Sequence, residues 1–200
     1  MMQSRLGPAK NAARADADAR DALLIGQIAA GDEVAFAAFY RSYERRLFSF
    51  IQKKMNDPFE AADILHITFM DVWKNAASFE QRSRVSTWLF GIAYRKVVDR
   101  FRKNIPTPVD IDEEFGEIVS SDPSAFETLN AQEEAGHVRY CISTLKPNQR
   151  SVIELAFFEH MAYGEIATVM QCPEGTVKTR IMHAKAALKT CISKILGRRS

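Results

Sequence analysis

Apolar residues recur at steps of three and four along most of the chain, and this spacing predicts helices. In the stretch PEGTVKTRIMHAKAAL, residues 173–188, the residues Val177, Ile181, Ala184 and Leu188 share one helical face. The opposite face is polar and basic. We find no convincing alternation of apolar and polar residues of the kind that strands show. The pattern therefore predicts an all-α fold.

The first half of the chain is expected to form four helices. The first spans 21–30 and stops at Gly31, and the second begins after Asp32. An Asp-Pro pair at 57–58 starts the third, because proline fits the first turn of a helix. The polar loop SFEQRSRV precedes the fourth helix, for which Ser86 or Thr87 is a plausible N-cap. The inward stripe of the second helix is expected to comprise Val34, Phe36, Phe39, Tyr40, Tyr43, Leu47, Phe50 and Ile51.

The second half is again helical in pattern. Helices are expected over 137–145, 147–161 and 162–170, and a long final helix follows the three-residue turn Gln-Cys-Pro. A short helix, a tight turn and a longer helix form the pattern of a helix-turn-helix motif. In that motif the second helix enters the major groove of DNA.

A stretch with three prolines, many acids and weak periodicity separates the two halves. Such composition is typical of a flexible connector. We therefore expect two small helical domains joined by an acidic flexible linker. The expected boundaries are a flexible tail at 1–20, a first domain at 21–103, the linker at 104–135 and a second domain at 136–200.

The net charge of +2 conceals a strong division of charge along the chain. Residues 1–103 carry 17 Lys and Arg against 12 Asp and Glu, and residues 137–200 carry ten against four. Residues 104–136 carry nine Asp and Glu and no Lys or Arg. Two basic blocks around an acidic connector indicate a polyanionic partner, although solvated charged faces would give the same count.

Enzymatic signals are poor. The chain has no GxGxxG, Walker, HExxH or GxSxG motif, so we expect no catalytic activity and no cofactor. The three cysteines form no CxxC and no even framework, which fits reduced thiols. His137 and Cys141 are too few ligands for a metal site, so no metal is expected. Without a membrane-length apolar run or a signal peptide, we expect a cytoplasmic protein with no membrane insertion.

The final helix carries the candidate DNA-binding residues. Side chains near its N-terminal half could reach base edges: Thr176, Lys178, Thr179, Met182 and His183. Arg180 and Lys185 would lie near phosphates. An ordinary helical hairpin with a basic solvent-exposed face is the alternative at this point.

The fourth helix of the first half adds an independent signal. Arg95, Lys96 and Arg100 lie on it together with aromatic residues that include Trp88 and Phe101. Basic side chains follow a phosphate backbone, and aromatic rings stack on unpaired bases. Trp88 and Phe101 fit a core position better than a stacking platform, since large aromatic residues are usually buried.

Together these segments resemble the small sigma factors of bacterial RNA polymerase, the extracytoplasmic-function (ECF) group. The stretch from AFAAFYRSY to VVDRFRK resembles their promoter-melting domain, and LKPNQRSVIELAFFEHMAYGEIATVMQCPEGTVKTRIMHAKAAL resembles their upstream-element domain. The resemblance covers about 21–195. It implies core RNA polymerase, promoter DNA and an anti-sigma factor as partners. It also implies a role in a stress response.

The resemblance assigns roles to individual residues. The final helix would bind the upstream (−35) element as duplex DNA. A loop and helix in the first domain would hold the downstream (−10) element as a single strand, through Phe79, Arg84, Thr87, Trp88, Arg95, Lys96 and Arg100. The third helix would bind polymerase through Asp63, His66, Ile67, Met70 and Asp71.

Some positions depart from the family pattern. Ile67 stands at a polar contact position, Ala162 replaces a usual capping Ser or Thr, Arg84 replaces a small residue and His183 replaces a common arginine. Ile67 bears on the contact with core polymerase, and loss of the cap at Ala162 costs about 1 kcal/mol locally. The change at His183 predicts a promoter preference that differs from the commonest one. The acidic linker either enters the polymerase cleft or is a plain tether. The alternative functions are a stand-alone helix-turn-helix regulator, which would carry a sensor or dimerisation domain in its first half, and a helical protein that binds no nucleic acid.

Overall fold

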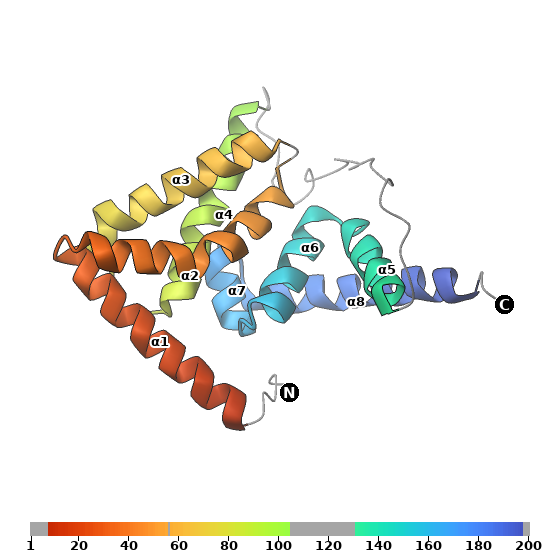
Figure 1. The fold of residues 1–200 in the computed structure, drawn as a ribbon. Coiled ribbons are helices and arrows are strands. Elements are labelled where there is room, and N and C mark those ends of the chain that lie inside the picture. The colour runs from red at the N-terminus through yellow and green to blue at the C-terminus, as the bar shows by residue number, and fades with distance from the viewer. Residues whose placement is uncertain (1–7, 56, 105–130, 198–200) are drawn as a thin grey trace. The chain divides into compact units, whose positions relative to one another are not determined.

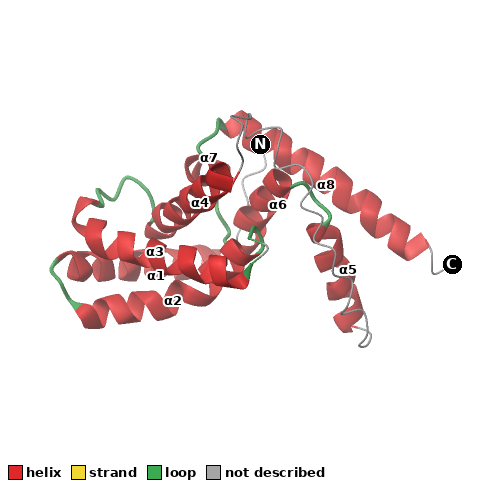
Figure 2. Cartoon of the chain, turned by 90° about the horizontal axis from the view of Figure 1, so that it is seen from above, coloured by secondary structure: helices red, strands yellow, loops and turns green. Residues whose placement is uncertain are grey.

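A computed structural model gives the fold and describes residues 8–55, 57–104 and 131–197 (Figure 1). Every regular element in these ranges is a helix, and none of the described residues forms a strand (Figure 2). The expected all-α class is thus confirmed. Most of the expected acidic linker, residues 105–130, lies outside the described ranges.

The chain divides into two compact units. The first comprises residues 1–106 together with 164–171, and the second comprises 107–163 and 172–200. The four helices predicted in the first half all lie in the first unit, and the long final helix lies in the second. The domain boundaries expected at 21–103 and 136–200 stay predictions.

Helix α1 spans Pro8–Ala29, so the expected start at residue 21 is wrong. The segment before residue 21 lacks an apolar stripe, which is why periodicity missed it. It is rich in alanine, the residue with the highest intrinsic helix propensity. The helix ends just before Gly31, whose φ of +87° suits glycine.

The contact between α1 and α2 contains a buried hydrogen bond. The Tyr43 hydroxyl donates to the Asp21 carboxylate, and both residues are almost fully buried. Burial raises the pKa of Tyr43, and the hydrogen bond to Asp21 raises it further. The tyrosine therefore stays neutral, which keeps it a hydrogen-bond donor to the buried carboxylate.

Helix α2 spans Glu33–Gln52 and begins at the predicted place. The Asp32 side chain caps it by accepting hydrogen bonds from the backbone N–H groups of Val34 at 2.8 Å and Ala35 at 3.0 Å. The expected inward position of Val34 is wrong, since this side chain is 79% exposed. The buried stripe starts instead at Ala35 and continues through Phe39, and Val34 lies about 100° away around the helix.

Helix α3 spans Pro58–Asn75 and begins as predicted at the Asp-Pro pair. The Asp57 carboxylate accepts a hydrogen bond from the Phe59 backbone N–H at 2.8 Å, and Pro58 occupies the first turn. One face of the helix is buried and comprises Ala61, Ile64, Leu65, Thr68, Phe69 and Val72. Trp73 is half-buried, and its ring packs against Phe36 of α2 with 5.2 Å between centroids.

A short 3-10 turn, η1 (Ala76–Ser78), and a loop lead into α4 (Val85–Asn104). The helix begins at Val85, so the expected N-caps Ser86 and Thr87 lie inside its first turn. Thr87 is 1% exposed, and its hydroxyl donates to Glu165 instead of capping the helix. The Trp88 backbone N–H donates to the Arg84 carbonyl at 3.0 Å, so the helical bonds already begin at Arg84, before the expected caps.

The second unit contains α5 (Ala131–Ser143), α6 (Pro147–Ile153), the π-turn η2 (Glu154–Phe158) and α8 (Glu174–Gly197). Pro147 occupies the first turn of α6 as expected. The helix expected to reach 161 ends earlier, in the π-turn. Leu145, Ile153 and Ala184 form a buried cluster, and Leu188 packs against it.

Cys141 of α5 and Cys191 of α8 form a disulfide, so the expectation of reduced thiols is wrong for these two residues. They are 50 residues apart in sequence, with Cα atoms 5.8 Å apart. The spacing carried no signal because the tertiary contact between α5 and α8 brings them together. Cys172 remains outside the disulfide.

Reduction of this disulfide is expected to lower the local stability of α5 and α8 by about 2–4 kcal/mol, since the disulfide closes a long loop. Hydrogen exchange of the full chain, read by mass spectrometry with and without reductant, measures this change. The Cys141→Ser variant should reproduce it, whereas Cys172→Ser should not. Equal exchange of α5 and α8 in both redox states would contradict a stabilising role.

Candidate nucleic-acid interface

The long helix α8 has one buried face and one exposed basic face. Val177, Ile181 and Ala184 are buried, as the spacing predicted. The candidate DNA-binding residues all lie on this helix: Lys178, Thr179, Met182, His183 and Lys185 are exposed, and Thr176 and Arg180 are half-buried. Met182 is 60% exposed, so its side chain is accessible on this face.

Several of these side chains already have contacts within the second unit. Lys178 Nζ lies 2.7 Å from Glu174 Oε1, an exposed pair one helical turn apart that contributes little to stability. Arg180 Nη1 donates to Cys172 Sγ at 3.6 Å, which holds it beside the turn. The Lys185 ammonium lies 5.7 Å from the centre of the Phe157 ring. A phosphate or base could therefore replace Glu174 as the partner of Lys178 at a low cost in free energy.

The short helix of the motif is α7 (Tyr163–Met170), and it ends at the turn that precedes α8. Gln171 in the turn has a φ of +51°. The expected order of short helix, tight turn and long helix is therefore present along the chain.

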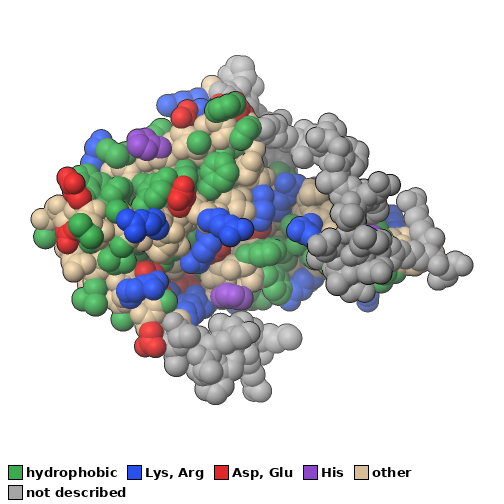
Figure 3. Space-filling view, in the orientation of Figure 1, with side chains coloured by type: hydrophobic (Ala, Val, Ile, Leu, Met, Phe, Trp, Pro, Cys, Tyr) green, Lys and Arg blue, Asp and Glu red, His purple; other side chains and the backbone are tan. Residues whose placement is uncertain are grey.

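In the first unit, the predicted basic residues lie on α4. Arg95 is exposed, while Lys96 and Arg100 are half-buried. Lys96 Nζ lies 2.6 Å from Asp71 Oδ2, and Arg100 Nη1 lies 3.0 Å from Glu60 Oε1. Both acids belong to α3. On the face seen in Figure 3, Lys and Arg side chains of this unit are interspersed with hydrophobic ones.

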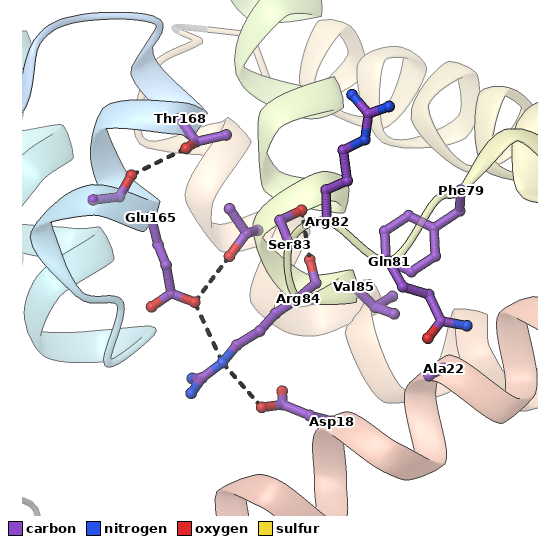
Figure 4. A pocket seen from close by; sticks show the side chains of 12 residues that line it. Asp18, Ala22, Phe79, Gln81, Arg82, Ser83, Arg84, Val85, Glu165 and Thr168 are labelled. Atoms are coloured by element: carbon purple, nitrogen blue, oxygen red, sulfur yellow. Dashed lines mark hydrogen bonds and ion pairs between the residues drawn. The ribbon is translucent and has the colours of Figure 1, made fainter.

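The loop between η1 and α4 forms one wall of a pocket of about 500 Å³ in the first unit (Figure 4). The Phe79 ring lies on the pocket wall and packs against Trp88, with 5.0 Å between ring centres. Trp88 is half-buried, between a core and a surface position. An aromatic ring beside polar groups suits an unpaired base, which needs both stacking and hydrogen bonds.

Two carboxylates that the sequence did not reveal face this loop. Arg84 Nε lies 3.0 Å from Asp18 Oδ2 and 3.4 Å from Glu165 Oε1 (Figure 4). Burial raises the pKa of the Asp18 carboxyl, although the nearby Arg84 and Arg14 oppose this. The charge of Arg84 is thus balanced by two carboxylates. The sequence did not reveal these partners because they are far from Arg84 along the chain.

The predicted polymerase-contact residues form an exposed strip on α3. Asp63, His66, Ile67 and Met70 are exposed and Asp71 is half-buried. Ile67 is 40% exposed and Met70 37% exposed, so both offer apolar area to a partner. Phe59, which the sequence did not single out, is 80% exposed and lies four residues before Asp63 on the same strip.

The described residues contain no metal-ligand group and no helix that could span a membrane. These residues contain no group of three or more His, Cys, Asp or Glu side chains placed to hold a metal ion. His137 is buried and the Cys141 sulfur is in the disulfide, so this pair offers no open ligand set. Within the same described ranges, no helix is both long and apolar enough to span a membrane.

Family models match both halves of the chain. Residues 39–105 match the model described as Sigma-70 region 2, and residues 137–188 match Sigma-70, region 4. The chain is 29% identical over 172 residues to the ECF RNA polymerase sigma factor SigK of Mycolicibacterium vanbaalenii, covering 84% of this chain and 87% of that protein. It is 28% identical over 186 residues to the RNA polymerase sigma-H factor of Pseudomonas aeruginosa, covering 88% and 96%.

Solved structures show the same fold. CnrH in complex with the cytosolic domain of CnrY matches with a TM-score of 0.62 and 22% identity, covering 88% of this chain and 98% of that one. The sigma factor RpoE from Bartonella quintana, in complex with the anti-sigma factor NepR, matches with a TM-score of 0.57 and 25% identity, covering 78% and 97%.

If α8 contacts base edges, Lys178→Ala and His183→Ala should each weaken specific duplex binding by about 1–3 kcal/mol. The measurement is fluorescence anisotropy of the full chain with a duplex selected from a random library. Lys194→Ala removes an exposed charge near the far end of α8 and serves as the control. Equal affinity of the wild type for selected and scrambled duplexes would contradict base recognition by this helix.

Proposed function

Because the chain belongs to the extracytoplasmic-function group of bacterial sigma factors, we propose that it binds core RNA polymerase and directs transcription initiation at a specific set of promoters. The observation that carries this proposal is that region 2 and region 4 models match in order across separate helical parts of one chain. Sigma factors are non-catalytic subunits, so RNA synthesis belongs to the polymerase core.

The basic face of α8 recognises the upstream promoter element as duplex DNA. Its exposed polar and basic side chains suit the major groove, where base edges are distinguishable. His183 is an exposed imidazole at a position where related factors carry arginine. Imidazole lacks the bidentate guanidinium geometry that favours guanine, so His183 shifts the base preference at its position.

The first unit captures the downstream element after it opens. The basic side chains of α4 follow the phosphates of the unpaired strand, and the loop at 79–87 holds a base against the Phe79 ring. The aromatic contact between Phe79 and Trp88 keeps this ring in place. These side chains suit a single strand, because an aromatic ring can stack on any unpaired base and a basic side chain can bind any phosphate.

The outer strip of α3 binds the largest subunit of core polymerase. Phe59, Ile67 and Met70 provide apolar area on it, and Asp63 provides a charge. Apolar anchors with a charged rim are typical of protein interfaces. Ile67 replaces a polar family residue, so apolar burial contributes more to this interface than in relatives with a polar side chain there.

An anti-sigma factor holds the protein inactive until a stress signal arrives. The Bartonella quintana relative was solved in complex with an anti-sigma factor, which supports this part of the proposal. As a polymerase subunit, the protein acts in the cytoplasm.

The function is tested by transcription from a promoter library with core polymerase in vitro. Added protein is expected to produce promoter-specific run-off transcripts that core polymerase alone does not make. Core polymerase with Lys178→Ala protein controls for specificity, because it should still assemble but initiate less at the selected promoters. Transcription no greater than with core alone, together with tight binding of promoter duplexes by the free chain, would favour a stand-alone regulator instead.

A further inference from the structure

Two ion pairs join α3 to α4 in the first unit. Glu60 Oε1 lies 3.0 Å from Arg100 Nη1, and Asp71 Oδ2 lies 2.6 Å from Lys96 Nζ. Glu60 and Asp71 are eleven residues apart, which is about three helical turns, so they lie on nearly the same side of α3. Two of the predicted DNA-contacting cations, Lys96 and Arg100, are therefore paired with acids of α3, the helix proposed to bind polymerase.

Glu60 lies in the capped first turn of α3. It follows the Asp57 cap by three residues. The backbone N–H of Ala61 donates to the Asp57 carbonyl at 3.0 Å, so the turn is closed around Glu60. A carboxylate on a fixed backbone gives its partner a defined direction.

The ion pair leaves Arg100 able to bind DNA. A guanidinium has five N–H donors, and the Glu60 contact uses Nη1. The side chains of Glu60 and Arg100 are 34% and 29% exposed, so water and a phosphate oxygen can still reach the pair. An exposed arginine without a partner samples many rotamers, and ordering it on binding reduces affinity.

We propose that Glu60 is a positioning residue, which orients the Arg100 guanidinium toward the phosphates of the unpaired promoter strand before that strand arrives. Asp71 has the same relation to Lys96. This inference rests on the proposed function, because it assumes that α4 contacts DNA. It assigns to Glu60 a role in promoter binding that acts only through Arg100.

The proposal predicts that removing Glu60 changes DNA affinity in the opposite direction to that expected from simple electrostatics. An acid near a DNA-binding surface repels phosphates, so its removal should strengthen binding. If Glu60 positions Arg100, its removal weakens binding instead, because Arg100 must then be ordered when the strand binds. The slope of log affinity against log salt concentration reports phosphate contacts, at about 0.7 per phosphate for a single strand.

The test uses Glu60→Gln protein assembled with core polymerase, and a fluorescein-labelled single-stranded DNA of mixed sequence as the probe. Affinity is expected to fall about two- to five-fold, the range of a partly exposed ion pair. The salt slope is expected to stay unchanged, since Arg100 keeps its charge, whereas Arg100→Ala should lower it by about 0.7. Core-polymerase affinity is measured on the same protein, because Glu60 lies on nearly the same side of α3 as Asp71. DNA binding is therefore compared with core polymerase in saturating excess over both proteins. The melting temperature is expected to fall only slightly, since a partly exposed ion pair contributes at most about 1 kcal/mol.

Two further variants make the result specific. Asp99→Asn removes an acid from the exposed face of α4, for which no ion pair occurs among the described residues, and should leave affinity unchanged or raise it. Glu60→Gln in an Arg100→Ala background should have no further effect, because the partner is already gone. Asp71 variants are avoided, since this residue belongs to the proposed polymerase strip.

The possible outcomes separate this inference from the proposed function. Wild-type protein that fails to raise single-strand binding above that of core polymerase alone contradicts the proposed function. If the wild type does raise it, Glu60→Gln binding as tight as wild type, or tighter, overturns the positioning role. The same loss in the Arg100→Ala background would also overturn it, since Glu60 would then act independently of Arg100.

Discussion

The packing of α3 against its neighbours is the constraint on which the first unit depends. The helix buries one face, which includes Ile64, Leu65 and Phe69, and this leaves only its outer strip and its edges for other contacts. Burial of three such side chains contributes several kcal/mol, about 1.5–3 kcal/mol each. The ion pairs with α4 lie at one edge of this face, and the exposed Ile67 lies on the strip beside them. A single helix therefore carries both the proposed polymerase surface and the acids that pair with the cations proposed to contact DNA.

The second unit has a different constraint, because α8 leaves one whole face exposed, the face that we propose contacts DNA. A long helix that leaves most of its surface in water buries little apolar area, and here the buried side is narrow: Val177, Ile181 and Ala184. The disulfide between Cys141 and Cys191 adds stability that this small buried area does not provide, because it joins the far part of α8 to α5. Cross-links of this kind stabilise small domains whose cores are limited.

Local patterns in the sequence predicted the helices well and their partners poorly. The helix starts after Asp32 and Asp57 and the buried face of α8 follow from rules that act within a few residues. The early start of α1 was missed because alanine-rich helix propensity leaves no apolar stripe. The disulfide and the Glu60–Arg100 ion pair were missed because they join residues 50 and 40 positions apart. The candidate site residues were found on helix faces, whereas their acidic partners became visible only in three dimensions.

The central claim is that one small helical unit contacts polymerase through α3 and promoter DNA through α4. Site-specific photo-crosslinking in the assembled initiation complex tests it most directly. A photoreactive amino acid at Ile67 is predicted to form an adduct with the largest polymerase subunit, and one at Arg95 is predicted to form an adduct with the unpaired promoter strand. Adducts exchanged between the two positions, or none with polymerase from Ile67 in a transcribing complex, would contradict the account.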